Sequence, residues 1–172
     1  MCDTDRTSPY KFQVPTEMVD ELSHSADQLP DAGTEAHQRG SYQRIHYALW
    51  ADYNSDIRLS KEYVRDLPAS QVFLQANQHL FERLSNELRL LTPETYRRYG
   101  HVDQYLTGDL RRLGGAWHGM ALNRQIGVDN KVHQDWQDDV KGFNAVVPWG
   151  DTRVVFAFMS KGNFLLRLTD GS

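Results

Sequence analysis

The apolar periodicity of residues 71–91 constrains the fold more than any other feature of the sequence. Apolar side chains recur there about every 3.6 residues, while polar and charged side chains mostly fall between them. The apolar stripe consists of Phe73, Leu80, Phe81, Leu84, Leu88 and Leu91. We therefore predict one amphipathic helix over 71–91 that covers another part of the molecule with its apolar side.

A shorter helix is predicted directly after this one. Thr92 is an N-cap residue type, Pro93 suits the first helical position, and Glu94 places an acid in the first turn. Gly100 is expected to end the helix. The two helices are expected to meet at a sharp break.

The amino-terminal part is predicted to consist of helices and loops. Pro15 and Thr16 open a segment with helical spacing that Pro30 ends, and residues 31–41 have the composition of a surface loop. Two short helices are expected over 42–52 and 57–64. The first of these contains Ile45, Ala48, Leu49 and Trp50.

The carboxy-terminal third is predicted to form a sheet. After Gly114 and Gly115 the chain contains the runs GFNAVVPWG, TRVVFAFM and NFLLRL, which are rich in β-branched and aromatic residues. Helices followed by strands indicate an α+β fold, with the long helix bracing one face of the sheet. We divide the chain into a flexible amino terminus (1–15), a helical support region (16–115) and a β-rich core (116–172).

Composition restricts the class of protein. A chain of 172 residues fits one domain, and its single cysteine, Cys2, offers no disulfide framework. The acidic amino terminus lacks the features of a secretory signal, so we expect a nuclear or cytoplasmic protein. No apolar run approaches the roughly 20 residues that span a bilayer, so no membrane partner is expected. The net charge of -4 neither predicts nor excludes nucleic-acid binding.

Two His-x-Asp triplets are candidate metal-binding motifs. A His and an Asp two residues apart on a strand project to the same side, and non-haem Fe(II) sites use two His and one carboxylate. One triplet is His133-Gln134-Asp135, directly before the β-rich runs, and the other is His101-Val102-Asp103. His101 follows a predicted helix end, where exposed carbonyls favour a His for structural reasons. His133 and Asp135 are therefore the preferred candidates, with a polar turn before a strand as the alternative.

Other catalytic arrangements find less support in the sequence. Cys2 lies in the polar amino terminus and is a poor candidate nucleophile. Asp138 and Asp139 match a paired-carboxylate site, but an acidic solvated turn is the simpler interpretation. There is no H-E-x-x-H, G-x-S-x-G, G-x-G-x-x-G or Walker motif in the sequence.

The stretch WHGMALNRQIGVDNKVHQDWQDDVKGFNAVVPWGD resembles the TET/JBP type of 2-oxoglutarate and Fe(II)-dependent oxygenases. The likeness is strongest to the branch found in mushroom-forming fungi and their transposons, and it spans roughly residues 71–151. It rests on Ala121-Leu122-Asn123, His133-x-Asp135, Asp138, Gly142 and Val146-Val147-Pro148-Trp149-Gly150-Asp151, preceded by the helix break LTPETYRRY.

This resemblance implies a double-stranded β-helix, a distorted jelly-roll, backed by amino-terminal helices. It makes His133 and Asp135 the first two ligands of Fe(II), with 2-oxoglutarate as the cosubstrate. It further implies oxidation of the methyl group of 5-methylcytosine or thymine in DNA, after the base has been flipped into the site. Asp138 would contact the flipped base, and Asn123 would lie on the strand leading into the site.

The sequence departs from the family after Asp151. The family continues with a Gly-Gly pair, a second metal His and an Arg that holds 2-oxoglutarate, whereas this sequence has no His after His133. His46, His79 and His101 are assigned to helices or loops, His118 precedes the site strand, and Arg153 and Arg167 suit ordinary strand surfaces.

We therefore expect either a truncated or degenerate copy of such an oxygenase, which the missing His and Arg would leave inactive, or a non-catalytic remnant that binds DNA or protein. An unrelated α+β protein, in which HQDWQDD is a solvated turn, is the third alternative.

Overall fold

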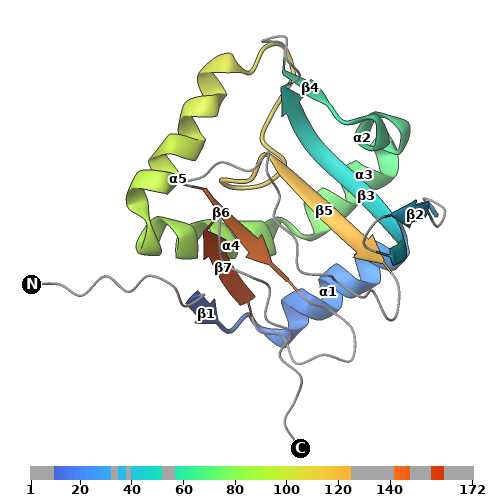
Figure 1. The fold of residues 1–172 in the computed structure, drawn as a ribbon, viewed down its shortest axis with the longest axis horizontal. Coiled ribbons are helices and arrows are strands. Elements are labelled where there is room, and N and C mark those ends of the chain that lie inside the picture. The colour runs from blue at the N-terminus through green and yellow to red at the C-terminus, as the bar shows by residue number, and fades with distance from the viewer. Residues whose placement is uncertain are drawn as a thin grey trace, which may run out of the picture.

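The computed structural model describes residues 10–31, 35–37, 40–51, 57–124, 142–147 and 156–160. Its helices are α1 (Thr16–Asp27), α2 (Lys61–Arg65), α3 (Leu67–Ala76), α4 (Gln78–Leu91) and α5 (Pro93–Gly100), followed by the 3-10 helix η1 (His101–Tyr105). Its strands are β1 (Tyr10–Phe12), β2 (Glu35–His37), β3 (Gly40–Ala51), β4 (Ile57–Leu59), β5 (Gly119–Arg124), β6 (Phe143–Val146) and β7 (Phe156–Ser160). The mixture of helices with small antiparallel sheets is an α+β fold, as predicted (Figure 1).

The strands fall into two sheets. In the larger sheet the long strand β3 pairs antiparallel with β2, β4 and β5, and Ile45 lies opposite Leu122 in the β3–β5 register. In the smaller sheet β7 lies between β1 and β6. The described strands make these two small sheets and do not trace the double-stranded β-helix that the sequence led us to expect.

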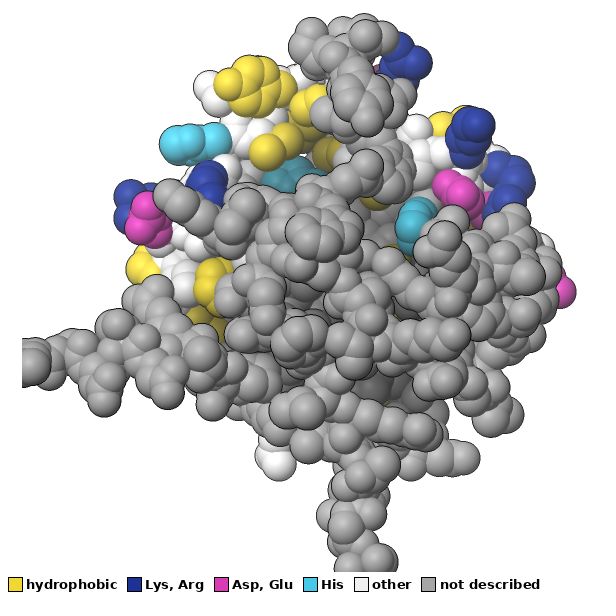
Figure 2. All heavy atoms as spheres, in the orientation of Figure 1, with side chains coloured by type: hydrophobic (Ala, Val, Ile, Leu, Met, Phe, Trp, Pro, Cys, Tyr) yellow, Lys and Arg dark blue, Asp and Glu magenta, His cyan; other side chains and the backbone are white. Residues whose placement is uncertain are grey.

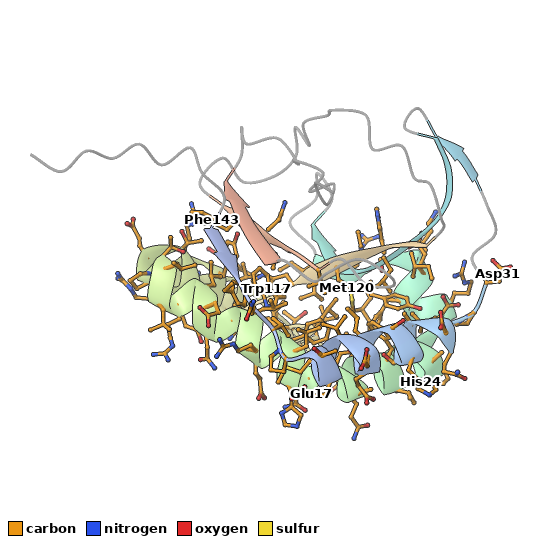
Figure 3. All side chains as sticks on the ribbon, turned by 90° about the horizontal axis from the view of Figure 1, so that it is seen from below. Glu17, His24, Asp31, Trp117, Met120 and Phe143 are labelled. Carbon is orange, nitrogen blue, oxygen red and sulfur yellow. The ribbon has the colours of Figure 1, made fainter. Side chains whose placement is uncertain are left out.

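The main core lies between the helices and the β3–β5 pair. Figure 3 shows the helices on one side and the strands on the other, with Trp117 and Met120 between them. Glu17 and His24 point outward from α1 in the same view, and both are exposed. The buried apolar side chains that join α1, α3 and α4 to β3 and β5 are Val19, Leu22, Ala26, Ile45, Tyr47, Phe73, Leu80, Phe81, Leu84 and Leu122.

The predicted long helix is two helices, because the backbone of Asn77, with φ -96° and ψ 12°, departs from helical geometry between them. Its side-chain Nδ2 donates to the carbonyl of Phe73 at 2.8 Å. Nδ2 also donates to Ser25 Oγ of α1, at 2.7 Å. A buried side chain that bonds the backbone within its own turn competes with the helical pattern. The apolar stripe was read correctly, but a tertiary contact to α1 sets the break.

The helix predicted over 42–52 is wrong, since residues 42–51 belong to β3. Ile45 and Tyr47 are fully buried while His46 between them is only partly buried, which is the alternation of a strand. Pairing with β5 satisfies the backbone groups over the same stretch. The helical spacing of Ile45, Ala48 and Leu49 was therefore overridden by a partner strand far along the chain.

The predicted loop at 31–41 and the predicted helix at 57–64 also need correction. The described part of 31–41 includes β2 and the start of β3, which pair with each other. Residues 57–64 divide into β4 and the beginning of α2, with Ser60 between them. Ser60 Oγ accepts from Tyr63 N–H at 3.4 Å and so caps α2.

The other elements follow the sequence closely. α1 begins at Thr16, α5 runs from Pro93 to Gly100, and strands occur in the predicted carboxy-terminal region. Strands β2, β3 and β4 lie within the region 16–115 that was assigned to helices, and β1 lies within 1–15. Within the described ranges, no helix combines the length and the apolar character that a bilayer crossing requires.

Candidate functional site

The predicted metal ligands lie outside the described residues. His133, Asp135 and Asp138 all belong to 125–141, the stretch between β5 and β6. β5 of the larger sheet precedes this stretch and β6 of the smaller sheet follows it, so it connects the two sheets along the chain. Arg153 and Arg167, the candidate carboxylate-binding residues, are likewise outside the described part.

Asn123 is the one predicted site residue whose backbone position is described. It lies in β5 opposite Arg44 of β3, so the expectation that it occupies a strand is confirmed. His46, which we had assigned to a helix, lies in β3 opposite Ala121. Because Ile45 and Tyr47 point into the helical core, His46 belongs to the opposite face of this sheet.

The competing triplet at His101 has a structural explanation. His101 is the C-cap of α5 and its side chain is exposed, as its place after a helix end predicted. The carboxylate of Asp103 is 2.7 Å from Arg112 Nη2. An ion pair already engages this Asp, which weakens the case for a metal ligand there.

The most elaborate polar arrangement among the described residues surrounds Tyr99 on α5. Its hydroxyl accepts from the backbone N–H of Phe143 at 2.8 Å and donates to the carbonyl of the same residue at 3.0 Å. Both backbone groups at the start of β6 are thus held by one side chain. The ring of Tyr99 lies edge-on to Trp117 and to His118, with centroid distances of 6.4 and 6.1 Å.

His118 is the titratable group at the centre of this arrangement. Its Nε2 atom is buried and has no hydrogen-bond partner within the described part of the chain. Burial lowers the pKa of His118, and the positive charge of Arg112 lowers it further. The charge of Asp103 and a hydrogen bond to the backbone of Tyr99 act in the opposite direction but do not reverse the shift.

The turn that carries Trp117 and His118 is held firmly against α4. Ser85 Oγ donates to the carbonyl of Phe81 at 2.7 Å and accepts from Ala116 N–H at 2.8 Å. Trp117 Nε1 also donates to the carbonyl of Phe81, at 3.3 Å. Gly115 has a φ of +53°, a left-handed conformation that glycine adopts without strain.

A second buried polar cluster supports the β3 side of the molecule. The side chain of Asp66 is only 4% exposed, and Arg65 donates to both of its carboxylate oxygens at 2.6 Å. Tyr47 OH donates to the same carboxylate at 3.4 Å. The hydrogen bonds from Arg65 lower the pKa of Asp66, and the Tyr47 hydroxyl adds to this effect. Burial of its ring raises the pKa of the neighbouring Tyr63.

Comparisons with family models, curated proteins and solved structures return no match for this chain. Within the residues described, no three His, Cys, Asp or Glu side chains are grouped so that they could hold one metal ion. The predicted ligands are not among those residues, so this finding does not bear on them.

The sequence did not reveal the cluster around Tyr99. His118 was noted only as preceding the site strand, and Tyr99 only as part of the LTPETYRRY helix break. Their contact depends on α5 being packed beside the start of β5, which is a tertiary arrangement. The local signal that could have indicated it is the run of Gly114, Gly115 and Trp117, because paired glycines before an aromatic are typical of a tight turn packed against a helix.

Proposed function

We propose that this chain is a TET/JBP-like protein that binds Fe(II) and 2-oxoglutarate and derives from enzymes that oxidise nucleobase methyl groups in DNA. The observation that carries the proposal is the spaced set of residues from Ala121 to Asp151, with His133-x-Asp135 at its centre. Asn123 lying in a strand of an antiparallel sheet with helices on one face is consistent with that family.

The two predicted ligands make up part of the ligand set of a non-haem Fe(II) site. His133 and Asp135 supply the imidazole and carboxylate that non-haem Fe(II) accepts, and 2-oxoglutarate with oxygen would supply the oxidation of the methyl group. The sequence gives no second imidazole after His133. Metal and cosubstrate binding is the activity that we propose for this sequence.

Anaerobic titration with Fe(II) and 2-oxoglutarate tests this proposal directly. We expect a weak visible charge-transfer absorption in the wild-type protein that is lost in His133→Ala and in Asp135→Ala. His101→Ala is the matched control, because it removes a His from the other His-x-Asp triplet and should leave the absorption unchanged. Absence of the band in the wild type, or its persistence in His133→Ala, would refute the proposal.

His46→Ala extends the same titration. His46 lies on the face of β3 that points away from the helices, beside the strand that contains Asn123. A loss of the absorption in His46→Ala would identify it as the imidazole that the carboxy-terminal sequence does not supply. An unchanged absorption would mean that His133 and Asp135 act without it.

The second candidate function is a non-catalytic module that binds DNA or another protein. On the face drawn in Figure 2, basic and acidic side chains lie beside one another at both edges of the described surface. DNA binding in the absence of metal, weakening steeply as salt is raised, would support this candidate, because phosphate contacts release counterions.

A further inference from the structure

The junction between α5, the turn before β5 and the start of β6 contains a titratable group beside a pair of backbone hydrogen bonds. We propose that Tyr99 and His118 form an acid-sensitive clamp, which holds β6 against α5 while His118 is neutral and releases it when His118 is protonated. This inference does not depend on the proposed oxygenase function, since none of its residues belongs to the predicted metal site.

The clamp itself is the pair of hydrogen bonds between Tyr99 and Phe143. The hydroxyl of Tyr99 engages both the N–H and the carbonyl of this residue, at 2.8 and 3.0 Å. The ring of Phe143 is only partly buried and packs beside Leu88 and Ala116. Because β6 pairs with β7 in the small sheet, this contact joins that sheet to the helical layer (Figure 1).

His118 contacts both the ring and the backbone of Tyr99. The two rings meet edge-on at 6.1 Å, and the imidazole also bonds to the backbone of Tyr99. A further ring contact of Tyr99, Trp117, is fixed to α4 through the carbonyl of Phe81. If the imidazole moved, Tyr99 would therefore lose a ring neighbour while the turn beneath it stayed in place.

Protonation gives the imidazole a reason to move. An imidazolium has two N–H donors, and its Nε2 is buried with no acceptor among the described residues. The charged groups that act on it are Arg112, which repels it, and Asp103, which attracts it but is already 2.7 Å from Arg112. A buried N–H without an acceptor is costly, so the charged ring is expected to turn toward water or toward Asp103, although its hydrogen bond to the backbone of Tyr99 favours the charged form. Either movement takes it away from Tyr99.

Amide hydrogen exchange at Phe143, followed by NMR in the full chain, tests the clamp. The exchange rates are expressed as protection factors, because these correct for the intrinsic pH dependence of amide exchange. In the wild type we expect the Phe143 amide to be protected near neutral pH and to lose protection several-fold in mild acid, along the titration curve of His118 recorded in the same samples. A protection factor that stays constant, or rises, as His118 titrates would overturn the proposal.

Three variants separate the clamp from a general effect of acid. His118→Gln should keep Phe143 protection independent of pH in this range, whereas His24→Gln, which removes an exposed His on α1, should behave as the wild type does. Arg112→Gln removes the repelling charge and should move the loss of protection to higher pH. Equal acid-induced loss in His118→Gln and wild type would show that another group is responsible.

Tyr99→Phe tests the hydroxyl directly. It removes both hydrogen bonds to Phe143 and should reduce protection there by roughly tenfold at neutral pH. The amide of Ile45 in the main core serves as the reference. If protection falls equally at both amides, Tyr99 supports the whole fold and the proposal of a local clamp is wrong.

Discussion

The two sheets of this protein are held in place by different interactions. The β3–β5 pair contributes fully buried apolar side chains, Ile45 and Tyr47 at 0% and Leu122 at 3% exposure, to a core shared with three helices. In the small sheet Phe12, Phe143 and Ala145 are only partly buried, and the hydroxyl of Tyr99 holds the first residue of β6.

This difference predicts a division of stability within the molecule. Burial of apolar surface is strong and insensitive to small changes in pH, whereas a few hydrogen bonds at a partly exposed edge can open locally. We therefore expect the β3–β5 pair to open only with global unfolding and the small sheet to open more readily. The stretch 125–141, which contains the predicted metal ligands, connects these two parts along the chain.

The largest expected effect comes from emptying the core beneath the β3–β5 pair. Phe73 of α3 is 1% exposed, and Phe73→Ala should lower the free energy of unfolding by about 3–5 kcal/mol. Denaturation by urea measures the loss. Its neighbour Val72 is 68% exposed, so Val72→Ala should change stability by less than about 0.5 kcal/mol. Similar losses in the two variants would mean that this core does not dominate stability.

A smaller loss is expected at the turn that links the helical layer to β5. Gly115 has a φ of +53°, and a Cβ there would overlap the hydroxyl of Ser85. Gly115→Ala should therefore destabilise the protein by about 1–3 kcal/mol. Gly100→Ala is the control, because Gly100 has no atom within 4 Å of an added Cβ. If thermal unfolding shows the same midpoint for both variants, the turn is less constrained than its geometry indicates.

The next smaller loss is expected at Ser60, whose side chain forms hydrogen bonds with the backbone of β3. Its hydroxyl donates to the carbonyl of His46 at 2.6 Å and accepts from Ala48 N–H at 3.2 Å, and the residue is 3% exposed. Ser60→Ala leaves both backbone groups without this partner and should cost about 1–2 kcal/mol. Thr107→Ala, at an exposed position, should be neutral. Amide exchange that accelerates at Phe143 but not at Ala48 would contradict the proposed role.

The sequence predicted those elements whose signals are local. Pro15 and Thr16 opened α1, Pro93 opened α5 and Gly100 ended it, because caps and prolines act within one turn of the chain. The apolar stripe of α4 identified side chains that are in fact buried, Leu80 and Leu84 among them.

The errors arose where a distant partner decides the structure. β3 was predicted as a helix because its spacing fits both periods, and only the pairing of Ile45 with Leu122 selects the strand. The break at Asn77 likewise depends on Ser25 of α1. For the candidate site, sequence placed Asn123 on a strand, whereas the assignment of His133 and Asp135 as iron ligands stays a prediction.

Two separate pH dependences are expected, one on each side of the comparison. Both groups have a lowered pKa in the folded protein, so each contributes stability at high pH that is lost as the pH falls. For His118 the loss begins below its ordinary value of 6.5, and for Asp66 below its ordinary value of 3.8.

Hydrogen exchange at the Phe143 amide should therefore accelerate as His118 is protonated. The free energy of unfolding should continue to fall at lower pH, where Asp66 is protonated. His118→Gln should remove only the step in mild acid, and Asp66→Asn should flatten only the dependence below about pH 4. Asp66→Asn also weakens the hydrogen bonds from Arg65 and Tyr47, so its stability at neutral pH should be lower by about 1–3 kcal/mol. If Asp66→Asn also changed the response of Phe143 in mild acid, the two sheets would open as one unit and the division drawn between them would fail.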